Sequence, residues 1–260
     1  KLVTTGIQNT LIGALAGDAL TDADQNTAVG YAALTADTLG SKSTAIGREA
    51  LVTQNFTTAT DSHNTAVGFA AGQAATTGIQ NTLIGSLAGD VLTDADFNTA
   101  IGYQVLSGDT LGSKSTAMGW FALGSQNFTT ATDSHNVAVG FSAGSGVTTG
   151  IKNTLIGANA GDAITIGFNN TVVGYDALGA NRNSGANVAI GYEALKVFDN
   201  TTSASHFNTA VGVQSGLSLT TGIQNTIIGG LAGAYSTTTD GSTFVGHKAA
   251  QGINGTKLTG

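Results

Sequence analysis

Short alternating segments, each closed by a glycine, recur along the whole chain. Each segment reads Asn-Thr-x-φ-Gly or a close variant, in which φ is β-branched. The residue before the glycine is Val or Ile in thirteen of fourteen units and Met118 in the other, which is typical of strands rather than helices. Ala follows three residues after the glycine in twelve of the fourteen units. We therefore predict two short strands per unit, one on each side of a glycine corner.

The glycines that close the segments, called motif glycines below, recur in a fixed cycle of intervals. The intervals are 17, 17, 21 and 17 residues, and this cycle repeats to give a 72-residue super-repeat. The fourteen motif glycines are Gly13, Gly30, Gly47, Gly68, Gly85, Gly102, Gly119, Gly140, Gly157, Gly174, Gly191, Gly212, Gly229 and Gly246. Glycine tolerates a positive φ and the close approach of a neighbouring backbone. We therefore expect every repeat to bend at this residue.

A fixed period of this kind indicates a stacked repeat fold. The sequence predicts an all-β, parallel β-solenoid or β-roll of about fourteen coils that runs through residues 1–260 as one region. Stacking would place Asn over Asn, Thr over Thr and Val over Ile, so that ladders of like side chains add to main-chain pairing. Helical repeats are excluded because the units are too short and too rich in Gly and Thr. Since both ends fall inside a repeat, we expect the chain to be a fragment of a longer fibre.

The composition of the chain limits the partners that we expect for it. Only 10% of the 260 residues are charged, 38 are Gly, and there is no Cys or Pro. The net charge of −7, with nine Lys and Arg in total, argues against nucleic acid as a partner. No apolar run approaches the roughly 20 residues of a membrane span, and the first residues lack the apolar core of a signal peptide. We expect no membrane insertion in this segment.

Residues 26–34 read Asn-Thr-Ala-Val-Gly-Tyr-Ala-Ala-Leu, and residues 64–72 and 187–195 are close relatives. The pattern resembles the head repeats of trimeric autotransporter adhesins and similar repeats of long phage tail fibres, and the likeness covers essentially the whole chain. It implies a left-handed β-roll, a homotrimer around a common axis, and an extracellular place on a virion or a bacterial surface. The units depart from the adhesin pattern in having Thr for Ser and in their length, which predicts side loops. Near-verbatim super-repeats favour the phage fibre.

Seven aromatic residues directly follow motif glycines. They are Tyr31, Phe69, Tyr103, Trp120, Phe141, Tyr175 and Tyr192. A stripe of this kind could stack on the sugar rings of a host glycan, or it could pack between the chains of a trimer. The side loops at 54–63, 126–135 and 197–206 are the alternative place for glycan contact.

Two patterns raise the question of metal binding. Asp22 and Asp24, repeated as Asp94 and Asp96, alternate like the start of a calcium loop, but neither the Gly at the sixth place nor the Glu at the twelfth follows. We predict solvated turns there.

The long units also each carry a histidine. Threefold symmetry could bring three imidazoles around one ion, but each histidine stands alone in a polar loop. We therefore expect His63, His135 and His206 to be surface residues and predict no metal site and no cofactor.

Nothing in the sequence predicts an enzyme. Glu49 and Glu193 occupy equivalent places, but Phe121 stands in the intervening copy and no acidic partner recurs beside them. No phosphate-binding Gly-Lys-Ser/Thr segment occurs, and short matches such as Gly-Phe-Ser-Ala-Gly at residues 140–144 are expected by chance in so Gly-rich a chain. We expect a stiff, protease-resistant fibre segment that presents or contributes to host-surface binding. The alternatives are a glycan-binding module that uses the side loops, and an ice-binding solenoid that uses the Thr column found in twelve of the fourteen units.

Overall fold

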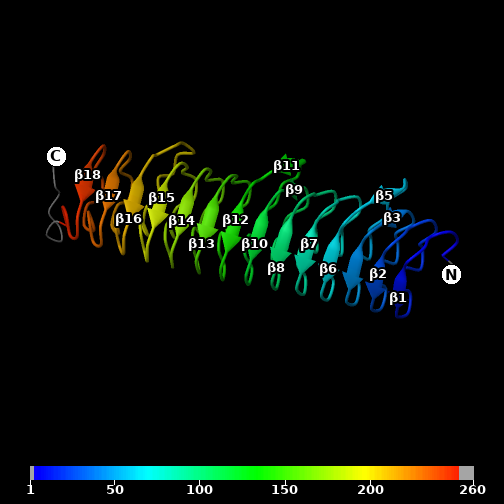
Figure 1. Cartoon of the computed structure of the whole chain (residues 1–260). Helices are drawn as coiled ribbons and strands as arrows, with labels where there is room; N and C mark the ends of the chain where they lie inside the picture. Colours follow the sequence, from blue (N-terminus) through cyan, green and yellow to red (C-terminus); the bar gives the residue numbers. More distant parts are fainter. Residues whose placement is uncertain (1–2, 252–260) are drawn as a thin grey trace. The chain divides into compact units, whose positions relative to one another are not determined.

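The computed structural model describes residues 3–251 (Figure 1). The chain divides into two compact units between Ser134 and His135. Each unit stacks seven coils, and every coil contributes one three-residue strand. No helix occurs within the described range. The structure thus confirms the predicted parallel β-solenoid of about fourteen coils.

The three-residue strands pair in parallel and in chain order within each unit. In the first unit they are β1 (Thr10–Ile12), β2 (Thr27–Val29), β4 (Thr44–Ile46), β6 (Thr65–Val67), β7 (Thr82–Ile84), β8 (Thr99–Ile101) and β10 (Thr116–Met118). In the second they are β12 (Val137–Val139), β13 (Thr154–Ile156), β14 (Thr171–Val173), β15 (Val188–Ile190), β16 (Thr209–Val211), β17 (Thr226–Ile228) and β18 (Thr243–Val245). The register places Thr27 over Thr44 and Val29 over Ile46, which are the predicted ladders.

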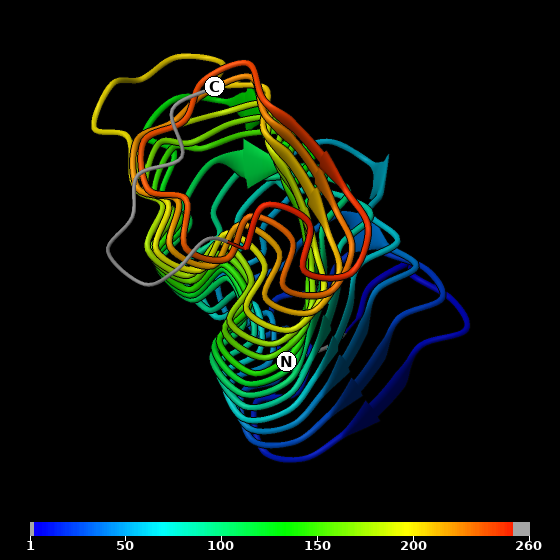
Figure 2. The same ribbon diagram turned by 90° about the vertical axis from the view of Figure 1, so that its left-hand side faces the viewer.

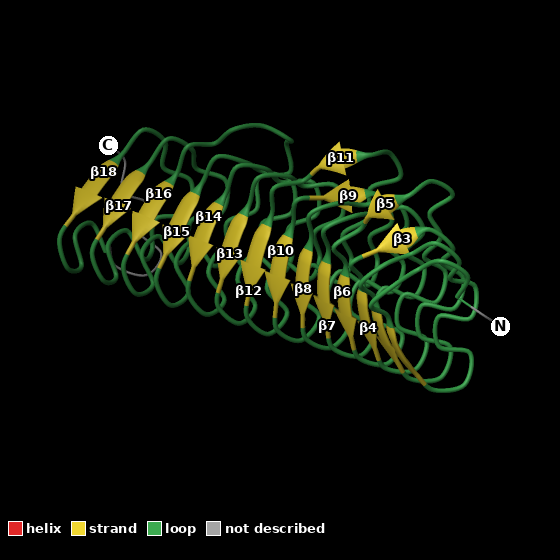
Figure 3. Ribbon diagram, turned by 45° about the vertical axis from the view of Figure 1, so that its right-hand side comes forward, coloured by secondary structure: helices red, strands yellow, loops and turns green. Residues whose placement is uncertain are grey.

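Four two-residue strands lie apart from these stacks (Figure 3). Strand β3 (Gly40–Ser41) pairs in parallel with β5 (Thr60–Asp61), and β9 (Gly112–Ser113) pairs in the same way with β11 (Thr132–Asp133). The other coils of the described range have a single strand. The prediction of two strands per coil is therefore wrong for most coils.

The second half of each coil is a run of turns because its backbone alternates in hand. Ala32 (φ 55°) and Leu34 (φ 53°) are left-handed, and the same two places, two and four residues after the motif glycine, are left-handed in every coil. These residues still pair between coils: the Ala32 N–H donates to the Ala14 carbonyl at 2.9 Å, and the Leu34 N–H to the Ala50 carbonyl at 3.0 Å. A left-handed residue with a side chain costs about 1 kcal/mol or more. Burial and inter-coil hydrogen bonds offset that cost.

The motif glycines lie at the corner between the two halves. Their φ angles run from 122° to 143°. A Cβ atom at Gly30 would lie 2.5 Å from the carbonyl oxygen of Gly47 in the next coil, so no larger residue fits there. The corner thus needs glycine both for its backbone angle and for the spacing of the coils.

The core of each coil is built from the central residue of the strand and the residues three and four positions after the motif glycine. Where the strand centre is Ala28 or Ala45, a fully buried leucine, Leu34 or Leu51, lies four residues after the motif glycine. Where the strand centre is Leu83, that later position is a glycine. In these coils a large residue at one position is matched by a small one at the other, and the coils of each unit follow nearly the same path (Figure 2).

Directly before most of the three-residue strands, a buried asparagine forms hydrogen bonds with backbone groups. Asn98 donates its backbone N–H to Asn81 Oδ1 and its own Oδ1 accepts from the Ser115 N–H, both at 2.9 Å. Its Nδ2 donates to the Gly112 carbonyl, also at 2.9 Å. Asn98 therefore joins its own coil to the preceding one through its backbone and to the following one through its side chain, which is why a buried polar residue is tolerated here.

Candidate functional site

In each unit, the residues directly before and after the motif glycines form an outward-facing row, called the outer strip below. Before the glycines, Ile84, Ile156 and Ile228 have relative exposures of 37–40%. After the glycines, the seven predicted aromatic residues have exposures between 44% and 55%: Tyr31, Phe69, Tyr103, Trp120, Phe141, Tyr175 and Tyr192. The outer strip is therefore apolar although it faces solvent in the single chain.

Four of the seven aromatic rings of the strip contact a side chain of a neighbouring coil. Tyr175 stacks on Tyr192 with ring centroids 5.6 Å apart and ring planes within 12°. The guanidinium of Arg48 lies 5.9 Å from the ring centroid of Tyr31 and 5.6 Å from that of Phe69, within the range of a cation–π contact. Each of these four rings thus uses one face for a contact within the chain.

The outer strip carries almost no charge. Arg48 is its single Lys, Arg, Asp or Glu residue. Small residues follow the motif glycine in the first coil of each super-repeat: Ala14, Ser86, Ala158 and Gly230. A strip with one charge loses little hydration energy when it is covered, because burial of ions is the expensive step.

The 21-residue coils are called the long coils below, and in the first super-repeat a buried polar cluster joins the long coil to the coil before it. Asp37 Oδ1 accepts from the Gly40 and Phe56 N–H groups at 3.0 and 3.2 Å, and its Oδ2 accepts from Gln54 Nε2 at 2.6 Å. Gln54 Nε2 also donates to Ser43 Oγ at 2.8 Å. Burial raises the pKa of Asp37, although these hydrogen bonds favour the carboxylate and partly oppose that effect.

The second super-repeat repeats the cluster. Gln126 Nε2 donates to Asp109 Oδ2 at 2.5 Å and to Ser115 Oγ at 3.0 Å. An ion pair of 2.5 Å crosses the outer side of each of these two regions, Lys42–Asp61 in the first and Lys114–Asp133 in the second. In each pair the lysine directly follows one short strand (β3 or β9) and the aspartate lies in its partner strand (β5 or β11). The ion pair therefore stabilises the base of the exposed loop that precedes the second short strand.

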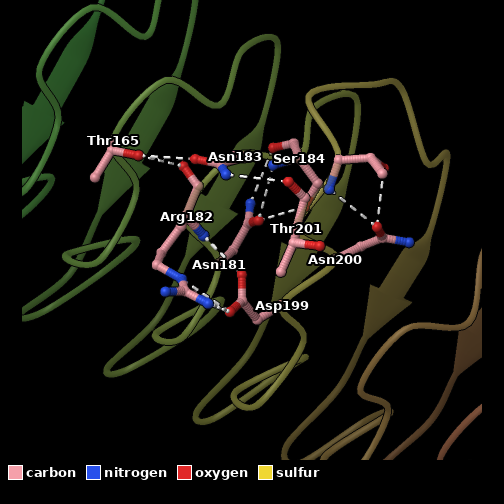
Figure 4. Close-up of polar contacts among 9 residues, drawn as sticks. Thr165, Asn181, Arg182, Asn183, Ser184, Asp199, Asn200 and Thr201 are labelled. Carbon is pink, nitrogen blue, oxygen red and sulfur yellow. Dashed lines mark hydrogen bonds and ion pairs between the residues drawn. The ribbon is translucent and has the colours of Figure 1, made fainter.

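The third super-repeat replaces the whole cluster, and Figure 4 shows the polar contacts around one of the replacing residues, Asn181. Asn181, Asn187, Phe198 and His206 stand where the first copy has Asp37, Ser43, Gln54 and Ser62. The paired short strands are reduced to one bridge between Gly185 and Ser205. Arg182 pairs instead with Asp199, through contacts of 2.9 and 2.5 Å.

The histidines separate into two kinds. His63 and His135 are exposed at the left-handed place before the motif Asn, with φ of 51° and 50°. His206 is only 4% exposed, so the expectation of a surface position is wrong for this residue. The reason is a one-residue shift that puts it in the inward-facing register of Ser62. Within residues 3–251 no three His, Cys, Asp or Glu side chains are grouped so as to hold a metal ion.

The acidic residues singled out by sequence are hydrogen-bonded to the preceding coil. Asp24 Oδ1 accepts from the Ile7 N–H at 2.7 Å, and Asp22 Oδ1 from Thr5 Oγ1 at 2.7 Å. Asp94 and Asp96 make the same contacts one super-repeat later. These carboxylates cap backbone or side-chain donors between coils.

The two glutamates make local contacts in separate units. Glu193 Oε1 accepts from Lys196 Nζ at 2.7 Å, and Glu193 Oε2 accepts from Gln214 Nε2 at 2.8 Å. Glu49 accepts from Arg48 and, at 3.1 Å, from Gln73. Each carboxylate thus bridges neighbouring positions of its own face of the solenoid.

The stacked parallel coils, the asparagine ladder and the glycine corners define the chain as a β-solenoid repeat protein. In comparisons with family models, curated proteins and solved structures, nothing matches this chain. No helix of the described residues is long and apolar enough to cross a membrane.

Sequence reasoning missed the buried cluster of the long coils. The available signal was that four positions change together: Asp37, Ser43, Gln54 and Ser62 recur as Asp109, Ser115, Gln126 and Ser134, and all four differ in the third copy. Joint replacement of this kind is expected of residues that bond to one another, since changing one alone leaves buried partners unsatisfied.

Proposed function

We propose that this chain is a segment of the shaft or head of an extracellular fibre built from three copies of itself, of the phage tail fibre or adhesin kind. The observation that carries the proposal is the outer strip. In one unit it is three residues wide, about 10 Å, and seven coils long, about 34 Å. That area, about 340 Å² per unit, is in the size range of the largest apolar patch on a typical soluble protein, and such patches are often functional. A second copy offers the same strip at the same coil spacing.

The inter-coil bonding supports a mechanical role. Within each unit the coils are joined by parallel main-chain pairing and by buried side chains, and the ladder asparagines add hydrogen bonds between coils, as Asn98 illustrates. Stability in such a stack comes mainly from contacts between adjacent repeats. A segment of this kind serves as a stiff spacer that holds a host-binding part away from a virion or cell surface.

The first test is the mass of the native particle by light scattering. A trimer of the 25.7 kDa chain has three times that mass, about 77 kDa. A stable particle of 25.7 kDa would contradict the trimer and leave the outer strip without its proposed partner. Measurement over a range of protein concentrations separates a closed trimer from open-ended association.

Contact with a host-surface glycan is the second candidate function, and the exposure of the long-coil loops favours it. Residues 57–59, 129–131 and 201–205 are all exposed and consist of Thr, Ala and Ser. Four aromatic rings of the outer strip already use one face on a neighbouring coil, which favours the polar loops as the place for a sugar. Replacement of these loops by short Gly-Ser links, with the oligomer intact, should abolish binding on a glycan array. Unchanged binding would exclude the loops.

A further inference from the structure

The third long coil holds its loop differently from the other two. In the first two copies, paired short strands and a buried Asp–Gln–Ser cluster secure the stem. In the third copy one isolated bridge remains, and residues 201–205 are all exposed. The loop 199–205 must therefore be held by contacts that the other copies lack.

His206 supplies one of those contacts from a buried position. Its Nε2 lies 3.1 Å from Thr202 Oγ1, and the Thr202 hydroxyl donates in turn to Asn200 Oδ1 at 2.9 Å. The Nε2–H is then the donor to Thr202, and Nδ1 carries a lone pair. Nδ1 is buried and has no hydrogen-bond partner, while the ring lies edge-on to Phe198 with centroids 5.9 Å apart.

We propose that His206 is a pH-sensitive latch for the loop 199–205, which is closed when the imidazole is neutral and opens when it is protonated. Protonation adds an N–H at Nδ1 and puts a charge against the apolar ring of Phe198. The Ala204 backbone favours the protonated ring, but the loss of hydration on burial is the larger effect. A buried charge is unfavourable unless the group moves to water. The ring can reach water only by leaving its place, and its contact with Thr202 then breaks.

The charged groups packed around His206 do not compensate for its protonation. Arg182 on the preceding coil and Asp199 on its own coil pair with each other. The neighbouring segment of the next coil, residues 220–224, contains no ionisable side chain. Its Gln224 N–H donates to the His206 carbonyl at 2.8 Å, which holds the backbone but not the ring.

The direction of the pH effect follows from the burial of the ring. Desolvation lowers the pKa of His206 below its ordinary value of 6.5. The closed loop thus favours the neutral ring, and its stability is complete above the ordinary value. That stability falls as the pH drops below 6.5 toward the lower pKa of the closed state. Opening would expose Phe198, which has no exposed surface in the closed loop.

The test is limited proteolysis of the full chain at about pH 7.5 and about pH 5, read as cleavage within residues 199–205. Rates are divided by those of a free peptide of residues 197–208, which removes the pH dependence of the protease. We expect the normalised rate to rise about tenfold or more in acid. Equal normalised rates at both pH values would overturn the latch.

Two variants assign the effect to one imidazole. His206→Gln keeps a polar group near Thr202 but does not titrate, so its ratio of acid to neutral cleavage should be close to one whatever its absolute rate. His135→Gln, at an exposed histidine of another long coil, should keep the wild-type ratio. Retention of the acid response in His206→Gln would refute the proposal. An NMR titration gives a second readout: the loop amides should shift with the same midpoint as the His206 ring.

Discussion

Leu83 fills the space that two glycines leave open, Gly72 in the preceding coil and Gly89 in its own. A Cβ atom at Gly72 would lie 2.8 Å from Leu83 Cδ1, and one at Gly89 would lie 2.9 Å from Leu83 Cδ2. The same relation recurs one super-repeat later, where a Cβ at Gly161 would lie 2.9 Å from Leu155 Cδ2. The large strand-centre residue and the glycines around it thus form one packing unit.

A double-mutant cycle should detect that unit. Gly72→Ala should lower the free energy of unfolding by about 2–4 kcal/mol, since it combines overpacking with a left-handed alanine. Leu83→Ala should lower it by about 2–5 kcal/mol because it opens a cavity. The double variant should lose less than the sum, because the new methyl group occupies part of that cavity. Denaturant unfolding followed by circular dichroism measures all three.

Gly241→Ala is the matched control for the cycle. Gly241 has φ 59°, like Gly72, but nothing lies within 4 Å of its Cβ position. This substitution should cost only the backbone term, about 1 kcal/mol. Strict additivity of Gly72→Ala and Leu83→Ala would show that the two residues do not act together.

Removal of one ladder asparagine should weaken the stack locally. Asn98→Ala leaves the buried Gly112 carbonyl and Ser115 N–H without their partners, so we expect a loss of about 2–4 kcal/mol. Native-state hydrogen exchange should show faster exchange in the coils next to Asn98. Asn55→Ala is the control, because Asn55 is exposed, and it should change stability by about 0.5 kcal/mol or less. Equal losses would argue against the ladder.

The buried carboxyl of Asp37 should make the stability of the first unit depend on pH. Its pKa is raised in the folded chain, so the folded state favours the protonated acid. Relative to Asp37→Asn, the wild-type protein should therefore lose stability as the pH rises from the unfolded value of 3.8 through the higher folded value. Denaturant midpoints between about pH 3 and pH 7 measure this difference.

Glu193 gives the opposite sign and so serves as the control. Hydrogen bonds from Lys196 and Gln214 lower the pKa of Glu193 in the folded chain. Relative to Glu193→Gln, the wild-type protein should lose stability as the pH falls from 4.5 toward the lower folded value. The same slope for both pairs would contradict the environments described for the two carboxyl groups.

A charge in the outer strip should dissociate the proposed trimer without unfolding the chain. Ile156 is 39% exposed in the strip, and Ile166 is 40% exposed at another corner of the coil. We expect Ile156→Glu to give particles of one chain mass with an unchanged β-sheet spectrum, because an unpaired charge in an interface costs several kcal/mol. Ile166→Glu should leave the oligomer intact. If both variants behave alike in light scattering, the strip is not the interface.

The fold itself could be read from the sequence because its information is periodic. A motif that returns every 17 or 21 residues requires like residues to stack, and β-branched residues before each glycine indicate a strand. The number of coils and the ladder of Thr27 over Thr44 follow from that period alone. The seven exposed aromatics are likewise fixed by their place beside the motif glycine.

Only the tertiary structure shows the features that depend on how neighbouring coils pack against one another. Turns rather than second strands follow the glycine because residues such as Leu34 accept a left-handed backbone when their side chains are buried, and no propensity scale predicts that outcome. The burial of His206 likewise depends on how the coils stack. One shifted residue in the third long coil turns the imidazole inward against Phe198, and whether a side chain meets water or a neighbour is known only when the coils are stacked.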